Sequence, residues 1–138
     1  MTLFPQHNAA IEYTRKRLGD AACKVSWICD DITKTKQLKK YDVWHDRAVF
    51  HFLTNSSDRQ AYLDLLNESL SSGGYFIVAT FAPDGPDKCS GLPICRYSLE
   101  ELEATLGSSF RVVTSSQHTH LTPTGKTQRF TLAAFQKV

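Results

Sequence analysis

Residues 41–54, YDVWHDRAVFHFLT, contain the features from which the fold is best predicted. An apolar run over residues 41–44 is typical of a buried strand, and a second apolar patch covers residues 49–53. Three polar side chains stand between them: His45, Asp46 and Arg47. Polar groups at the carboxyl end of a central strand mark a ligand crevice in an open α/β sheet, so we take these three as site candidates. A solvated turn is the alternative.

Composition describes an ordinary globular protein. The chain has 138 residues, 41% of them hydrophobic and 22% charged, which predicts one soluble domain over residues 1–138. A net charge of +2 is far from the basic footprint of a nucleic-acid-binding protein. The first ten residues lack the pattern of a secretory leader, and no apolar stretch is long enough to span a bilayer. We expect a cytoplasmic protein that binds neither nucleic acid nor membranes.

The four cysteines form two pairs, each with five residues between its members: Cys23 and Cys29, then Cys89 and Cys95. Neither spacing matches a zinc knuckle or a redox CxxC motif, so free thiols are expected and no metal centre is predicted. Cys23 and Cys29 flank a strand-like run and are expected in the core. Cys89 falls in a polar loop.

Helix and strand signals alternate along the first half of the chain. A helix is predicted from Asn8, as its cap, to about Leu18, followed by a strand over residues 25–28. The next strand begins at Tyr41 after a polar crossover. Asn55 or Ser56 caps an amphipathic helix that Gly73 and Gly74 are expected to end.

The second half continues the alternation. The apolar run over residues 75–81, YFIVATF, predicts a strand buried on both faces, and a Pro- and Gly-rich loop follows over residues 82–94. Ser98 and Glu101 form a capping box for a helix that ends at Gly107. Residues 110–114 and 129–135 are the last two strands, joined by a long connection that carries histidines. The sum predicts an α/β fold with a mostly parallel sheet and an antiparallel C-terminal strand.

Three long motifs carry a resemblance to a known family. They are HDRAVFHFLT at residues 45–54, TFAPDGPxxCSGLPxxRY at residues 80–97, and HxHxTPxGxxQxF at residues 118–130. With the order of elements, they resemble a bacterial-type subfamily of class I S-adenosylmethionine-dependent methyltransferases, whose sheet is Rossmann-like. The resemblance runs from about residue 8 to the end of the chain.

The resemblance implies roles for particular residues. Asp31 matches the acid that accepts a hydrogen bond from the adenine amino group, and Ile32 lies beside the ring. The stretch His45, Asp46 and Arg47 matches the segment next to the methionine half of the cofactor. Methyl transfer asks the protein to orient the acceptor and, for a protonated acceptor, to remove a proton. His45 or Asp46 is expected to do so, with His45 preferred because imidazole titrates near neutrality.

Five residues are candidates for the side of the small-molecule acceptor: Cys89, Arg96, His118, His120 and Gln128. A thiol and two imidazoles suit a metal or a soft acceptor. Arg96 and Gln128 suit hydrogen bonds to an anionic or polar substrate. The sequence shows no complete ligand set with a specific spacing, so substrate contacts are preferred over a metal.

The sequence departs from the family pattern in one respect. The chain contains no GxGxG, and nothing in residues 1–10 supplies the glycine-rich loop and ribose-binding acid of the family. The resemblance therefore implies an N-terminally truncated domain that is weakly active or inactive alone. Two alternatives remain: a non-catalytic binding or regulatory module derived from a methyltransferase, and a different nucleotide-binding α/β protein.

The family's strand order, 3-2-1-4-5-7-6, predicts a consequence of losing strands 1 and 2. The strand beginning at Tyr41 would expose an unpaired edge, which invites pairing. We expect residues 25–28 to pair with residues 42–44 and give a five-stranded sheet in the order 3-4-5-7-6. A homodimer through the exposed edge is the alternative.

Overall fold

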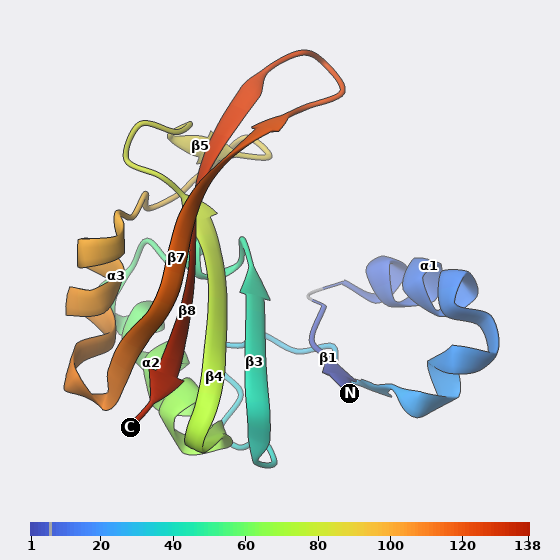
Figure 1. Ribbon diagram of the computed structural model, residues 1–138. Helices are drawn as coiled ribbons and strands as arrows, with labels where there is room; N and C mark the ends of the chain where they lie inside the picture. The colour runs from blue at the N-terminus through green and yellow to red at the C-terminus, as the bar shows by residue number, and fades with distance from the viewer. Residues whose placement is uncertain (6) are drawn as a thin grey trace. The chain divides into compact units, whose positions relative to one another are not determined.

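Helices and strands alternate along the chain much as the sequence predicts (Figure 1). The structure is a computed structural model that describes residues 1–5 and 7–138. It has two compact units, Met1–Lys36 and Gln37–Val138, and each is described here by itself. Among the described residues, no helix is both long and apolar enough to cross a membrane.

The first unit consists of two short strands and two helical segments: β1 (Thr2–Leu3), α1 (Asn8–Leu18), η1 (Gly19–Lys24) and β2 (Ser26–Trp27). β1 and β2 pair in parallel, with Thr2 opposite Ser26. α1 ends at Gly19 as predicted, where a φ of 54° favours glycine.

Three predictions for this unit were wrong. The N-cap of α1 is His7 and not Asn8, and no side chain caps the helix. Cys23 and Cys29 are exposed and not in a core, because the strand between them has only two residues and the thiols lie outside it. The predicted pairing of residues 25–28 with residues 42–44 does not form, since β2 pairs with β1 instead.

The second unit contains the main sheet. Its strands are β3 (Tyr41–Arg47), β4 (Leu70–Phe81), β7 (Phe110–Leu121) and β8 (Thr127–Lys137). A small hairpin is formed by β5 (Lys88–Cys89) and β6 (Leu92–Pro93). The helical segments are η2 (Phe50–Phe52), α2 (Ser56–Ser69), α3 (Leu99–Leu106) and η3 (Gly107–Ser109).

The strand order of the main sheet is β3-β4-β8-β7. β3 and β4 are parallel, whereas β8 runs antiparallel to both of its neighbours. The sheet is therefore mixed, and the expectation of a mostly parallel sheet was wrong. The order corresponds to the 4-5-7-6 portion of the predicted arrangement. Among the described residues this sheet has no fifth strand, because the segment expected to supply it pairs within the first unit.

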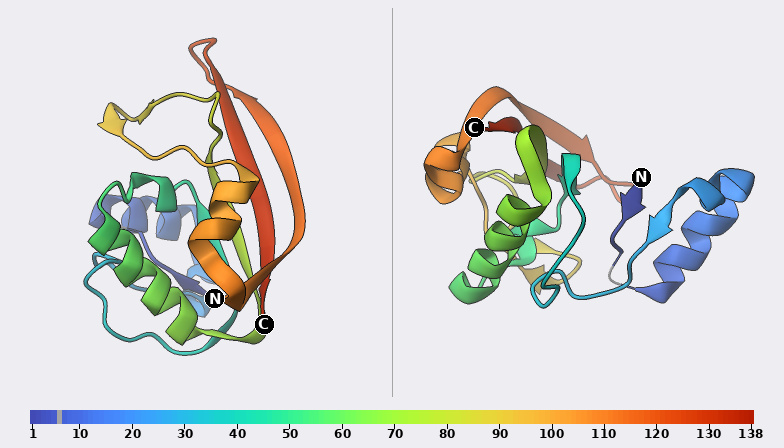
Figure 2. Two further views of the ribbon diagram at one scale, coloured as in Figure 1. Left: turned by 90° about the vertical axis from the view of Figure 1, so that its left-hand side faces the viewer. Right: turned by 90° about the horizontal axis from the view of Figure 1, so that it is seen from below.

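One face of the sheet is covered by α2 and α3 (Figure 2). The core lies here, with fully buried Phe76 of β4 and Phe135 of β8 6.4 Å apart between ring centroids. Tyr62 of α2 and Leu102 of α3 are also fully buried. Asn55 caps α2 by accepting a hydrogen bond from the Ser57 amide, and the capping box of Ser98 and Glu101 is present on α3, both as predicted.

The opposite face, which we call the open face, keeps apolar side chains exposed. Strand alternation puts Val43, Tyr75 and Ile77 on it, and they are 54%, 41% and 40% exposed. The partner residues of β8, Leu132 and Ala134, are half-buried. Within the described residues β3 pairs only with β4, so the sheet also has a free edge at β3.

Gly73 and Gly74 do not end α2, contrary to prediction. The helix ends at Ser69, and both glycines lie inside β4. A Cβ atom at Gly74 would stand 2.9 Å from the carbonyl oxygen of Asp42 on β3, so glycine permits the close approach of the two strands. The register shift between Tyr41 and Val43 falls at the same place.

The last two strands are longer than predicted. β7 and β8 continue past the end of β4 as a two-stranded ribbon (Figure 1). The predicted histidine-bearing connection is therefore mostly strand, and the turn that remains lies between Leu121 and Thr127.

Candidate functional site

The carboxyl end of β3 separates the three candidate residues between the two faces of the sheet. His45 pairs with Ile77 and Arg47 with Ala79, so both lie on the open face, and both are exposed. Asp46 pairs with Val78 on the helix-covered face and is 5% exposed. The two-residue period of a strand requires this separation. His45 and Asp46 therefore do not share one binding surface.

Asp46 holds the turn that follows β3. Its Oδ1 accepts a hydrogen bond from the Val49 amide at 2.8 Å, and its Oδ2 accepts one from the Phe50 amide at 3.1 Å. These contacts satisfy amides at the start of η2, as an N-cap does in a longer helix. Ala48, between strand and helix, has a φ of 61°, and its amide donates to Ala79 at 2.9 Å.

Tyr62 of α2 completes this buried arrangement. Its hydroxyl donates to Asp46 Oδ2 at 2.6 Å and accepts from Trp44 Nε1 at 3.0 Å. Burial raises the pKa of Asp46, against the opposing effect of its hydrogen bonds. Burial and the adjacent Asp46 carboxylate also raise the pKa of Tyr62. The sequence analysis did not find Tyr62, since it resembles any core position of an amphipathic helix.

His51 is a second buried polar residue near the end of β3. Its side chain is fully buried, and Nδ1 accepts a hydrogen bond from the Phe81 amide at 3.2 Å. Nε2 has no hydrogen-bond partner among the described residues. Burial lowers the pKa of His51 to about 4, so the ring is neutral at neutral pH. The two flanking phenylalanines in FHF were the one sequence signal that this histidine lies in the core.

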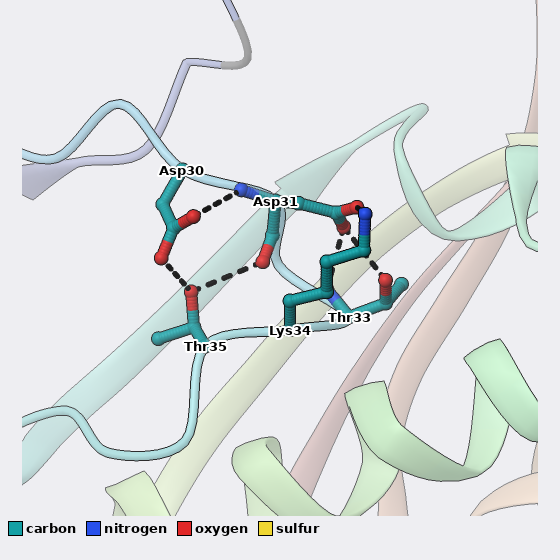
Figure 3. Close-up of polar contacts among 5 residues, drawn as sticks. All are labelled: Asp30, Asp31, Thr33, Lys34 and Thr35. Carbon is teal, nitrogen blue, oxygen red and sulfur yellow. Dashed lines mark hydrogen bonds and ion pairs between the residues drawn. The ribbon is translucent and has the colours of Figure 1, made fainter.

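Asp31 lies in the first unit, in a turn with several polar contacts (Figure 3). Its Oδ1 accepts from the Thr33 hydroxyl at 2.7 Å and from the Thr33 amide at 2.9 Å. Lys34 Nζ stands 3.3 Å from Oδ2. The hydrogen bonds from Thr33 lower the pKa of Asp31, which stays ionised at neutral pH. Ile32 beside it is buried.

Three of the acceptor-side candidates lie together on the ribbon. His120 of β7 is directly opposite Gln128 of β8, and His118 is opposite Phe130. Since the register is regular here, His118, His120 and Gln128 share one face, which is the open face. Both histidines are exposed and Gln128 is half-buried.

The other two acceptor-side candidates lie in the loop after β4. Cys89 is half-buried in β5, opposite Leu92. Arg96 Nη1 donates to the carbonyl of Gly85 at 3.2 Å and thereby ties the two ends of the loop together. The loop contacts the base of the ribbon, where Arg129 Nε lies 3.2 Å from Asp84 Oδ2.

The structure thus forms two clusters on the open face. His45 and Arg47 stand at the free edge on β3, and the ribbon residues stand on β7 and β8. Two strands separate β3 from β7, a distance of about 14 Å. A single acceptor that contacts both clusters must therefore span at least this distance. Among the described residues, no group of three or more His, Cys, Asp or Glu side chains could hold a metal.

Comparison with known proteins finds similarity in structure alone. No protein-family model matches the chain, and no curated protein matches it. Solved structures do: the N-methyltransferase NodS from Bradyrhizobium japonicum, in complex with S-adenosylhomocysteine, has a TM-score of 0.73 at 15% identity. A SAM-dependent methyltransferase from Methanosarcina mazei has a TM-score of 0.78 at 12% identity.

A third similar structure is the 1,6-didemethyltoxoflavin-N1-methyltransferase of Burkholderia thailandensis, with bound 1,6-didemethyltoxoflavin and S-adenosylhomocysteine, at a TM-score of 0.74 and 17% identity. All three alignments cover 99% of this chain. They cover 65% of NodS, 81% of the Methanosarcina protein and 60% of the Burkholderia enzyme. The chain therefore has a methyltransferase-like α/β fold and spans less than two thirds of two of these neighbours.

Proposed function

We propose that this chain is part of an S-adenosylmethionine-dependent methyltransferase domain that acts on a small-molecule acceptor. The observation that carries the proposal is the sheet order β3-β4-β8-β7, in which β8 runs antiparallel to both of its neighbours, β4 and β7. The chain aligns over 99% of its length with methyltransferases. The cofactor follows from two neighbours that bind S-adenosylhomocysteine, the product of methyl transfer.

The cofactor side is assigned to two short segments. Asp31 accepts a hydrogen bond from the adenine amino group, and Ile32 contacts the ring. His45 and Arg47 contact the methionine half. Two observations support these roles: Asp31 carries a pKa lowered by Thr33 and so stays ionised, and His45 and Arg47 are exposed at the carboxyl end of a strand.

His45 orients the acceptor and removes its proton. Transfer of the methyl group from the sulfonium forms one bond to the acceptor as the bond to sulfur breaks, so the protein supplies alignment and a base. Asp46 was an equal candidate for the base in the sequence. Because its carboxylate is buried and contacts two backbone amides and Tyr62, we assign it a positioning role for the turn after β3.

The acceptor side is assigned to the ribbon and the loop after β4. His118, His120 and Gln128 present donors and acceptors on the open face. Cys89 and Arg96 of the loop are assigned to the same acceptor, and the loop contacts the ribbon through Asp84 and Arg129. The acceptor is a polar small molecule in this proposal, because the two histidines are exposed and present polar groups.

The chain by itself is weakly active or inactive in this proposal, since its sequence contains no glycine-rich loop to approach the cofactor. A non-catalytic module that binds or regulates is the second candidate. The free edge of β3 supports pairing with a second copy of the chain. The cytoplasmic location expected from the sequence belongs to the same proposal.

The test is a titration of the isotope-labelled chain with ligand, in which the backbone amide signals are monitored by NMR. S-adenosylhomocysteine at millimolar concentration is expected to shift the amides of residues 30–33 and 45–47. Adenosine alone should shift only the first group, and methionine alone only the second. Asp31→Asn should weaken the adenosine effect and leave the methionine effect unchanged.

The outcomes separate the candidates. Saturable shifts in both groups support a cofactor site. Shifts confined to the ribbon or the loop would transfer the site elsewhere, and no shifts at all would overturn cofactor binding by this chain.

A further inference from the structure

The ribbon formed by β7 and β8 carries an exposed histidine pair in fixed register. From Thr114 opposite Ala134 to Leu121 opposite Thr127, each residue of β7 faces one residue of β8 without a bulge. His118 and His120 therefore project from the same face of one strand, about 7 Å apart at their Cα atoms. Two imidazoles at this spacing can turn toward a common point above the strand.

Neither imidazole is tied to another side chain in the part of the protein that the structure describes. No hydrogen bond or ion pair to His118 or His120 exists among the described residues, and both side chains are exposed. By contrast, the nearby Arg129 pairs with Asp84 and donates to Gln117, and its position in the register puts it on the other face. The histidine pair is thus free to bind a ligand, with the guanidinium directed away from it.

A third donor stands next to the pair. Gln128 is directly opposite His120, where Cβ atoms of cross-strand neighbours are about 5 Å apart. Its side chain has no hydrogen-bond partner among the described residues, and its amide oxygen is a metal ligand of the harder type. Phe130, opposite His118, packs on Phe81 with ring centroids 4.8 Å apart, which anchors the base of the site.

We infer that His118, His120 and Gln128 form a binding site for a divalent transition metal ion of the imidazole-preferring class, such as Zn²⁺ or Ni²⁺. Two nitrogens at 2.0–2.1 Å and one amide oxygen leave at least one coordination position for water or an added ligand. The backbone ladder holds the strand rigid before the metal arrives, which lowers the ordering cost of binding. The inference does not depend on the proposed methyl transfer.

The experiment is a titration of the full chain with ZnCl₂, in which the ¹H–¹³C NMR signals of the histidine rings are monitored. We expect the signals of His118 and His120 to move together and saturate, and EDTA to reverse the change. The ring of buried His51 should not respond. Movement of other histidine rings with His118 and His120 unchanged would overturn the inference, as would binding confined to the cysteines.

A matched set of variants tests the geometry. His118→Ala and His120→Ala should each weaken Zn²⁺ binding at least tenfold, and Gln128→Leu by a smaller factor. The control combines Thr119→His with His120→Thr, which keeps two histidines but puts them on opposite faces of the strand. It should lose as much affinity as His120→Ala. A control that binds as tightly as the unmodified chain would show that the pair does not chelate.

The titration also stands apart from the proposed function. Zn²⁺ binding can succeed in a chain that shows no response to S-adenosylhomocysteine, and the reverse result is equally possible. Because all substitutions are at exposed or half-buried positions of the ribbon, the backbone spectrum of the sheet serves as a check that each variant is folded.

Discussion

The hydroxyl of Tyr62 on α2 lies 2.6 Å from the carboxylate of Asp46 at the end of β3, and this contact joins the helix to the turn that follows the strand. Both residues are buried, and Trp44 Nε1 donates to the same hydroxyl. The side chains on the helix-covered face thus fix the segment whose opposite face presents His45 and Arg47.

Tyr62→Phe should lower the free energy of unfolding by about 1–3 kcal/mol, because it removes the acceptor of the Trp44 N–H and one of the hydrogen bonds to Asp46 Oδ2, which keeps only the Phe50 amide. Urea denaturation of the variant measures the change. Tyr13→Phe is the control, since Tyr13 is 71% exposed and should give no measurable change. Equal effects from both substitutions would show that the buried hydrogen bonds contribute nothing.

His51 should make the protein less stable in mild acid. Its pKa is lowered from 6.5 to about 4 by burial, so between these values the unfolded chain binds a proton that the folded chain does not. The free energy of unfolding should therefore fall as pH decreases from 6.5 to 4, by on the order of 2–3 kcal/mol from this residue.

Urea denaturation across that pH range measures the effect as a difference between the protein and His51→Gln, which lacks the titration. The control is His118→Gln, a substitution of an exposed histidine on β7, where the difference between the protein and its variant should lack the contribution of His51. A parallel pH profile for the protein and His51→Gln would contradict the prediction.

Asp46 should contribute to the pH dependence with the opposite sign. Its pKa is raised from 3.8 in the folded state, so the folded chain holds the proton more tightly than the unfolded chain. The stability contributed by this residue is then greatest at low pH and declines as pH rises from 3.8 through the folded pKa. In Asp46→Asn that decline should disappear from the pH profile, and an unchanged profile would mean that the hydrogen bonds offset burial completely.

S-adenosylmethionine should bind the chain alone only weakly. The sequence contains no GxGxG, and losing two or three polar contacts of ~1–3 kcal/mol each weakens binding by several orders of magnitude. Isothermal titration calorimetry at micromolar cofactor should show no saturable heat. A micromolar dissociation constant would contradict this prediction. It would mean that the two segments assigned to the cofactor are sufficient to bind it.

Self-association, if it uses the free edge of β3, should be suppressed by Val43→Lys, because charge on an edge strand opposes pairing. Sedimentation velocity at increasing concentration measures the association. Val113→Lys on β7 is a matched control, since Val113 is 53% exposed and Val43 54%. Equal loss of association from both would place the interface elsewhere, and a monomer at all concentrations would exclude the dimer.

Local signals in the sequence correctly predicted the N-terminal caps of α2 and α3. Asn55 and the pair of Ser98 and Glu101 act through hydrogen bonds within four residues, so their effect is readable from the sequence. The Gly73–Gly74 pair was wrongly predicted to end α2. Glycine occurs both at helix ends and where two strands approach closely, and only the position of Asp42 on the neighbouring strand distinguishes the two cases. The position of Asp46 under α2 likewise depends on Tyr62, sixteen residues away.

The ribbon and the partner of β2 could not be predicted for different reasons. Residues 114–121 are exposed on both faces, so they lack the alternation of apolar and polar residues that marks a strand. β2 has only two residues, and its choice of β1 over β3 depends on the conformation of the whole first unit. The histidine pattern was visible in the sequence, but its shared face with Gln128 requires the cross-strand register.

The place of β8 in the sheet has a consequence for synthesis on the ribosome. β8 follows every other strand along the chain, yet it lies between β4 and β7 and brings Phe135 onto Phe76. Until β8 has emerged from the ribosome, β4 and β7 have no common neighbour, and Phe76 lacks the stacking contact with Phe135. The four-stranded sheet can therefore form only after β8 has been translated. Until then the nascent chain exposes apolar surface and unpaired strand edges, which chaperones protect from aggregation.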